Sequence, residues 1–244
     1  MSGRAHLWLL LPAAAVASLW LGWRGLATAD FLYPAWYRVL DVHGHIQHYA
    51  PRNRYRDGFA STTPAERQRL FAAIVDAIHA GGRGLAELEY HDAAGRPLDR
   101  LLREPEVQHL EDVSRLVRVL APAGWLAVAW TALHLALIRA RRWSVPTMSR
   151  LLAASLASVT AGVALVLVIG PVPVFYALHE WIFPPDRPWF FYYQDSLLTT
   201  MMKAPDLFGA IAAEILAVAL LLYTGILFAA RRLGGSDRTN AMIR

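Results

Sequence analysis

Residues 151–174 read LLAASLASVTAGVALVLVIGPVPV, a run without Asp, Glu, Lys or Arg. About 20 apolar residues in a helix are enough to span the hydrocarbon core of a bilayer. Three other apolar runs reach this length, at residues 7–26, 116–138 and 207–230. Of the 244 residues, 56% are hydrophobic and only 18% are charged, outside the usual range of soluble domains. The sequence therefore predicts four transmembrane helices.

The positions of the arginines predict how these helices cross the membrane. Arginines crowd the connection between the second and third runs and follow the fourth run: Arg139, Arg141, Arg142, Arg150, Arg231 and Arg232. Positive charge beside a span favours the cytoplasmic side, so both termini are expected there. The predicted order is helix 1–27, extracytoplasmic segment 28–115, helix 116–138, cytoplasmic loop 139–150, helix 151–174, extracytoplasmic loop 175–206, helix 207–230 and cytoplasmic tail 231–244.

The first run could also be a cleaved signal peptide. It is long, however, and it carries Trp8, Trp20 and Trp23 near its ends, as an anchored helix does. A retained helix is therefore the preferred interpretation. The predicted fold is a membrane all-α bundle of four transmembrane helices with a small extracytoplasmic α+β cap.

The cap is predicted from local signals in residues 28–115. Thr63 and Pro64 mark a helix start, and this helix is expected to run to His79 and to end at Gly81-Gly82. Its apolar face comprises Leu70, Ile74, Ala77 and Ile78. Residues 85–90 alternate as in a strand, residues 92–95 form a turn, and a second short strand follows. The aromatic-rich residues 30–49 could lie on the membrane surface.

Composition excludes several classes of function. The formal net charge of +5 comes with arginines beside the predicted spans, so it does not indicate a nucleic-acid-binding protein. The chain has no cysteine, which excludes thiol catalysis, disulfides and thiolate metal ligands. Imidazole remains as the side chain whose ordinary pKa suits proton transfer near neutral pH.

One histidine precedes the second apolar run. His109 shares a helical face with Asp112, three residues later, and with Glu106, three residues earlier. A carboxylate beside an imidazole fixes its tautomer and raises its basicity. The face therefore suits a general base, and the alternative is a solvated, charged helix end.

A second histidine follows the third apolar run. His179 is flanked by aromatic residues, and an ionisable group near membrane depth is by default a candidate functional residue. The alternative is an interfacial histidine in an aromatic belt. The following Glu180 does not complete a zinc-protease motif, because Phe183 stands where that motif needs its second histidine. Asp195 could pair with a histidine or cap a helix that begins at Ser196.

Residues 43–48 contain three more histidines, His43, His45 and His48. Such a density can indicate zinc or copper. The three do not share a helical face, and on a strand only His43 and His45 would share one. We therefore expect a structural or incidental role for this cluster.

The residues around the two flanking histidines resemble the lipoprotein intramolecular transacylase family of bacterial four-span membrane proteins. One matching block is Glu106-Val107-Gln108-His109-Leu110-Glu111-Asp112-Val113. The other comprises Phe175, His179, Phe183, Trp189, Asp195-Ser196-Leu197, Pro205 and Phe208. Order and spacing agree over most of the chain, and residues 30–95 match loosely.

The resemblance implies an acyltransferase of the bacterial cytoplasmic membrane. In the family reaction, the sn-2 acyl chain of a diacylglyceryl-cysteine lipoprotein moves to the α-amine of the same cysteine, which gives lyso-form lipoprotein. It implies His109 and His179 as catalytic residues, with the chemistry on the extracytoplasmic side. Orienting or substrate-binding roles fall to Asp112, Asp195, Glu106, Trp189 and Tyr176. No metal or organic cofactor is required, and the partners are the lipoprotein substrate and membrane lipids, with no nucleic acid.

Two other interpretations of the sequence compete with this one. The first is a non-catalytic membrane assembly or sensor protein that binds a partner through its cap. The second is a His-rich membrane metalloenzyme that uses His43, His45, His109 and His179. A transacylase needs His109 and His179 and survives chelators, a metalloenzyme loses activity with its metal, and a binding protein tolerates both histidines as alanine.

Overall fold

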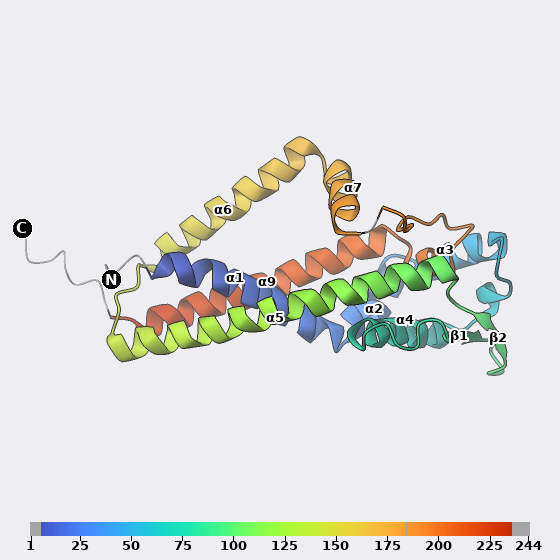
Figure 1. Ribbon diagram of the computed structural model, residues 1–244, viewed down its shortest axis with the longest axis horizontal. Helices are drawn as coiled ribbons and strands as arrows, with labels where there is room; N and C mark the ends of the chain where they lie inside the picture. The colour runs from blue at the N-terminus through green and yellow to red at the C-terminus, as the bar shows by residue number, and fades with distance from the viewer. Residues whose placement is uncertain (1–5, 184, 236–244) are drawn as a thin grey trace, which may run out of the picture. The chain divides into compact units, whose positions relative to one another are not determined.

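The computed structural model of the protein describes residues 6–183 and 185–235, and it is mainly helical (Figure 1). Four helices are long and apolar enough to cross a membrane: α1 (Leu7–Ala27), α5 (Glu104–Arg141), α6 (Met148–Ile169) and α9 (Asp206–Leu233). The prediction of four apolar helices of spanning length is confirmed. Their arrangement as a packed bundle remains a prediction.

Shorter elements connect these helices. They are α2 (Tyr33–Val39), α3 (Val42–Tyr49), α4 (Pro64–His79), α7 (Pro171–Ile182), α8 (Leu197–Met202) and the 3₁₀ turns η1 (Asp30–Leu32), η2 (Ala50–Arg52) and η3 (Phe59–Ser61). Strands β1 (Glu89–His91) and β2 (Pro97–Arg100) pair antiparallel. By their contacts the residues form two compact units, which we describe separately. The apolar unit comprises Met1–Trp23, Ala121–Leu178 and Ile215–Arg244, and the polar unit comprises Arg24–Leu120 and His179–Glu214.

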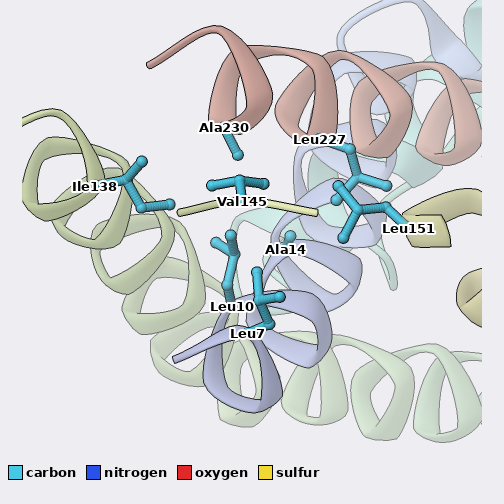
Figure 2. Close-up of a cluster of buried hydrophobic side chains, with 8 residues drawn as sticks. All are labelled: Leu7, Leu10, Ala14, Ile138, Val145, Leu151, Leu227 and Ala230. Carbon is cyan, nitrogen blue, oxygen red and sulfur yellow. The ribbon is translucent and has the colours of Figure 1, made fainter. Parts of the chain in front are cut away.

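The apolar unit has a core where four helices and one connection meet. Val145, in the connection between α5 and α6, is completely buried and lies at the centre of this core (Figure 2). Around it are side chains from the start of α1, the end of α5, the start of α6 and the end of α9: Leu7, Leu10, Ala14, Ile138, Leu151, Leu227 and Ala230. Close packing of these aliphatic groups holds one end of the unit together.

The third apolar run differs from its prediction. We expected one helix over residues 151–174, but α6 ends at Ile169 and α7 begins at residue 171. Gly170 separates them with a φ of 100°, a left-handed conformation that glycine adopts without steric cost. A residue before proline is also disfavoured in the α conformation. His179 therefore lies on a separate helix, rather than just after the span.

In the polar unit, α4 agrees with its prediction. The Thr63 side chain caps the helix by accepting a hydrogen bond from the backbone N–H of Glu66, and Pro64 is the first helical residue. Leu70, Ile74 and Ala77 are buried as expected. At the other end, the N–H of Gly82 donates to the carbonyl of Ala77 and closes the helix.

The hairpin is present, but its first strand is shorter than predicted. Residues 85–88 form turns rather than strand. The N–H of Leu85 donates to the backbone carbonyl of Gly82, and the N–H of Leu88 donates to that of Leu85. The turn at Asp92 is as expected, since its carboxylate accepts the N–H groups of Ala94 and Arg96.

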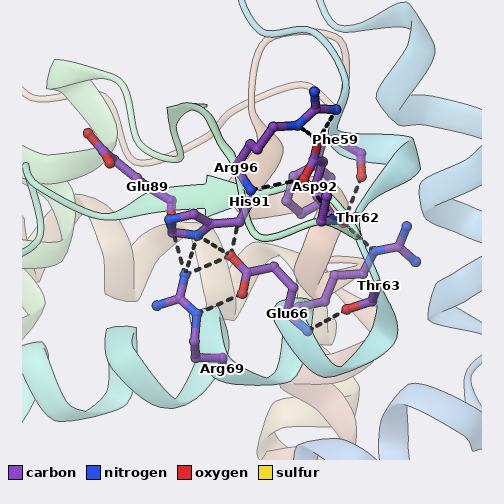
Figure 3. A network of polar contacts seen from close by, with 11 residues as sticks. Phe59, Thr62, Thr63, Glu66, Arg69, Glu89, His91, Asp92 and Arg96 are labelled. Carbon is purple, nitrogen blue, oxygen red and sulfur yellow. Dashed lines mark hydrogen bonds and ion pairs between the residues drawn. The ribbon is translucent and has the colours of Figure 1, made fainter.

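A polar network fastens the hairpin to α4 (Figure 3). Both carboxylate oxygens of Glu66 accept from Arg69 at 2.7 Å, and one of them also lies 2.9 Å from the backbone N and the Nδ1 of His91. The guanidinium of Arg69 also donates to the backbone carbonyl of Glu89. These charge-assisted bonds fix β1 on the first turns of α4 and lower the pKa of Glu66 to about 2.

The aromatic-rich residues 30–49 form α2 and α3, which pack inside the polar unit. The ring of Tyr33 stacks on Phe71 of α4 with centroids 4.1 Å apart, and its hydroxyl donates to the carbonyl of Met201. Tyr37 is buried beside the fully buried Arg67. This segment thus connects α4 with α8.

Candidate functional site

The first two turns of α5 carry three polar side chains on one face. Glu106, His109 and Asp112 are spaced by three residues, as the sequence predicted. Glu106 and Asp112 are buried, and His109 is half-buried. All three lie before residues 116–138, the part of α5 that is expected to span the membrane. Each of the three contacts the segment that follows α7.

The structure brings His109 and His179 to the same aromatic side chain. The ring of Phe183 lies 4.9 Å from the imidazole of His109 and 5.4 Å from that of His179, centroid to centroid. Each imidazole has a second aromatic neighbour. The ring of Trp189 lies 4.6 Å from that of His179, and the ring of Phe191 lies 6.2 Å from that of His109, centroid to centroid. Two imidazoles from distant parts of the sequence therefore share one aromatic environment.

This environment keeps His109 uncharged. Burial and the neighbouring His179 lower the pKa of His109 to about 4, and Asp112 opposes this shift. At neutral pH the imidazole therefore has a lone pair to accept a proton. A neutral histidine next to a second one is suited to general base and proton-relay chemistry.

Glu106 binds a serine of the facing segment. The Ser196 hydroxyl donates to Glu106 at 2.5 Å, and the backbone N–H of Arg103 donates to the other carboxylate oxygen at 2.8 Å. The backbone N–H of Leu198 adds a third bond. Burial raises the pKa of Glu106 against these bonds. Glu106 thus fixes the start of α8 to α5.

Asp112 binds two arginines through one oxygen. Its Oδ1 accepts from Nη1 of Arg115 at 2.8 Å and from Nη1 of Arg187 at 2.7 Å. Its Oδ2 is buried and has no hydrogen-bond partner among the described residues. The carboxylate therefore acts on His109 through its charge. It also binds Arg187, at a position of α5 one helical turn after His109.

Asp195 pairs with an arginine, and it does not cap α8. Its carboxylate lies 2.7 Å from the guanidinium of Arg54, and the backbone N–H of Arg54 donates to the carbonyl of Gln194. The side chain that caps α8 is Ser196, which accepts from the N–H of Thr199 at 3.0 Å. The expected cap was one residue early, because Ser196 has the extended backbone of a capping residue.

Residues 185–196 are thereby held at several points along their length. We call this segment the strap. Arg187 binds Asp112, Asp195 binds Arg54, and Ser196 binds Glu106. The carboxylates at positions 106 and 112 were expected to serve His109. Both anchor the strap, and of the two it is Asp112 whose charge acts on His109.

The other residues singled out in the sequence are Tyr176 and the three histidines of residues 43–48. Tyr176 belongs to the apolar unit, where its ring lies edge-on to Phe175. His43, His45 and His48 are on α3, where His45 and His48 both contact Tyr49. His43 contacts Arg67, His45 packs between Tyr49 and Tyr193, and His48 contacts Arg52. Within residues 6–183 and 185–235, no three His, Asp or Glu side chains are grouped to hold a metal ion.

Sequence reasoning did not identify Arg187 as a site residue. In the sequence it was only one of the charges of the loop at 175–206, and its partner Asp112 lies 75 positions away. Ser196 was seen only as a possible first residue of a helix. No local pattern connects either residue to α5.

No protein-family model, no curated protein and no solved structure matches the chain. A function must therefore be argued from the chemistry of the residues around His109 and His179.

Proposed function

We propose that the protein is a membrane acyltransferase of the lipoprotein intramolecular transacylase type. The reaction transfers the sn-2 acyl chain of a diacylglyceryl-cysteine lipoprotein to the α-amine of that cysteine. The observation that carries the proposal is the contact of His109 and His179 with the one ring of Phe183. The two histidines were singled out in the sequence by their neighbours, independently of this contact.

Ester aminolysis needs a neutral amine, an aligned ester carbonyl and a proton carrier. The substrate supplies both the nucleophile and the ester, so the enzyme needs no serine or cysteine nucleophile. In our proposal His109, which is neutral at neutral pH, removes the amine proton. His179 then passes a proton to the glycerol oxygen that leaves. Trp189 orients His179 by packing on its imidazole.

The carboxylates have supporting roles in this proposal. Asp112 stabilises the imidazolium of His109 while it carries the proton, because its charge favours the protonated form. Glu106 and Asp195 keep the strap in place through Ser196 and Arg54. Tyr176 is proposed to contact the acyl chain of the substrate.

The proposal includes the membrane arrangement expected from the sequence. The four long helices form a bundle in the bacterial cytoplasmic membrane, with both termini in the cytoplasm. The polar unit forms an extracytoplasmic cap, so that His109 and His179 face lipoproteins on the outer surface. The apolar helices and the arginines of residues 139–150 support this orientation.

The decisive experiment is mass spectrometry of a lipoprotein's N-terminal peptide. The chain is expressed in a host that makes only diacylglyceryl lipoproteins, beside His109→Ala, His179→Ala and the control His48→Gln. His48 is an exposed histidine of α3. We expect one acyl group to move to the amine at unchanged total mass with the wild-type chain and with His48→Gln, and no transfer with the other two variants.

Three results would contradict the proposal in different ways. An unchanged diacylglyceryl terminus with well-expressed wild-type chain would exclude this substrate. Transfer that persists in both alanine variants would exclude the two histidines as the catalytic pair. Transfer that a chelator abolishes and added zinc restores would instead indicate a metalloenzyme.

A further inference from the structure

The strap carries a cation to the neighbourhood of His109. Arg187 donates from Nη1 to Asp112 at 2.7 Å, and Asp112 is one helical turn beyond His109 on the same face of α5. Arg187 also follows Phe183, the ring that contacts both histidines, by only four residues. Through Asp112, the guanidinium of Arg187 is thus held at the next helical turn of α5 from His109.

The charges around Asp112 are unbalanced. Two guanidinium groups, from Arg115 and Arg187, contact a single carboxylate oxygen. One positive charge therefore has no counter-charge in this cluster. A local excess of positive charge favours a negative charge on a bound substrate or on an intermediate.

The guanidinium of Arg187 also has unused donors. Among residues 6–183 and 185–235, Asp112 is the only hydrogen-bond acceptor that the structure gives it, through one of its five N–H groups. A third of its side chain is exposed (33%), whereas that of Asp112 is 4% exposed. The buried carboxylate thus holds one edge of the guanidinium, and the rest can reach a ligand.

We propose that Arg187 is a catalytic residue that donates hydrogen bonds to the reacting ester carbonyl oxygen and stabilises the oxyanion formed there. Asp112 is a positioning residue that holds this guanidinium. The inference rests on the proposed acyl transfer and adds the group that binds the negative charge.

In the reaction, the amine nitrogen forms a bond to the ester carbonyl carbon, and the electron pair of the C=O bond moves to the oxygen. Arg187 contacts this oxyanion. When the C=O bond re-forms, the bond from carbon to the glycerol oxygen breaks, and that oxygen takes up the proton that the histidines removed from the amine. The products are an amide and an alcohol, and no other reactant is needed.

The test measures transfer kinetics with the purified full-length chain and a diacylglyceryl lipopeptide in micelles. We expect Arg187→Ala to lower kcat by about 100-fold or more, with KM changed by less than about threefold, because an oxyanion contact acts in the transition state. Arg187→Lys should retain more activity than Arg187→Gln, since it keeps a cationic donor. Added guanidinium ion should raise the rate of Arg187→Ala and leave the wild-type rate unchanged.

Arg96→Ala is the control for the loss of an exposed, ion-paired arginine. Arg96 pairs with Asp92 in the hairpin and has no role in the proposed site. We expect its removal to lower kcat by less than about threefold. Where Arg187→Ala does not accumulate, the comparison of Arg187→Lys with Arg187→Gln decides the question.

Several outcomes would overturn the inference. These are a kcat of Arg187→Ala within threefold of wild type, an equal loss in Arg96→Ala, a loss confined to KM, or equal rates for Arg187→Lys and Arg187→Gln. In each case the wild-type chain still transfers the acyl group, so the proposed function stands. Absence of transfer by the wild-type chain overturns the proposed function, and the role of Arg187 with it.

Discussion

The apolar unit and the polar unit differ in the charged side chains that they bury, because the buried Asp, Glu and Arg residues of the described chain belong to the polar unit. The polar unit encloses charged groups, including Arg67, Glu106 and Asp112, and provides each with hydrogen-bond partners. The apolar unit encloses small and aliphatic side chains around Val145, and it exposes large ones such as Leu167 and Val168. Exposed aliphatic helices are stable in lipid, and buried charges are tolerated where partners are preorganised. The comparison thus distinguishes a unit whose core is aliphatic from one that also encloses ion-paired and hydrogen-bonded charges.

The largest effect should follow from removing the buried guanidinium of Arg67. It is completely buried and donates to Tyr37, to the side chain of Thr62 and to the carbonyl of Ala60. Arg67→Met leaves these acceptors buried without their donor. We expect a loss of about 3 kcal/mol in the free energy of unfolding, measured by thermal unfolding in detergent.

Arg96, in the hairpin of the same unit, is the matched control for Arg67. Its side chain is 79% exposed, so Arg96→Ala should cost less than about 1 kcal/mol. Equal losses in the free energy of unfolding for the two variants would contradict this. They would show that the buried arginine stabilises the polar unit no more than the exposed one.

Leu10 and Leu9 form the corresponding pair of a buried and an exposed residue in the apolar unit. Leu10 is completely buried in the core around Val145, and Leu9 is 49% exposed. Leu10→Ala should cost about 3 kcal/mol, because it removes apolar contacts and leaves a cavity. Leu9→Ala should change the unfolding temperature in detergent very little. If Leu10→Ala is as stable as the wild-type chain, packing around Val145 does not hold this unit together.

A smaller, pH-dependent effect is expected from Glu66 in the polar unit. Arg69 and His91 lower its pKa to about 2, so its contribution is fully present above the ordinary carboxyl pKa of about 4.5. The contribution is lost as pH falls from there towards 2. We expect Glu66→Gln to reduce stability by roughly 2 kcal/mol at pH 7 and to have almost no effect near pH 2.

The free energy of unfolding of the wild-type chain and of Glu66→Gln, measured from pH 7 down to pH 2, gives this difference. Glu87→Gln, at an exposed position of the same unit, is the control and should follow the wild-type curve. A stability difference that stays constant with pH would contradict the assigned role of the Glu66 carboxylate.

Within the polar unit, some features could be predicted from the sequence and others could not. The cap of α4 and its apolar face depend on residues close together in the chain, so Thr63, Pro64 and Leu70 were sufficient to predict them. The periodicity that placed Asp112 beside His109 is equally local. The strap required contacts such as Arg187–Asp112, across 75 positions, for which one sequence contains no signal.

Histidines show this limit most directly. The sequence offered no pattern for His6 and His134, yet their ring nitrogens lie 3.2 Å apart in the apolar unit, across 128 positions. Both are buried, and His6 also contacts the carbonyl of Ser144. His109 and His179 were singled out as candidate site residues only because their immediate neighbours were informative. Local patterns such as the cap of α4 could therefore be predicted, and long-range pairing could not.

The smallest effect tests whether α6 packs against α9 within the apolar unit. Over most of its length α6 exposes its side chains, and of its residues Leu151 alone is buried. One polar contact joins the two helices, between the Ser155 and Tyr223 hydroxyls at 2.8 Å. Tyr223→Phe removes this bond and should cost about 0.6 kcal/mol, the usual value for a hydrogen bond between membrane helices.

A double-mutant cycle of Ser155→Ala and Tyr223→Phe isolates this contact from other effects of each substitution. Ser158→Ala is the control, because the Ser158 hydroxyl bonds within its own helix, to the carbonyl of Ala154. A coupling energy near 0.6 kcal/mol would show that α6 is also held to α9 at Ser155, one turn beyond Leu151. A coupling of zero would confine the packing of α6 to its first turn, at Leu151, and leave the rest of the helix to lipid.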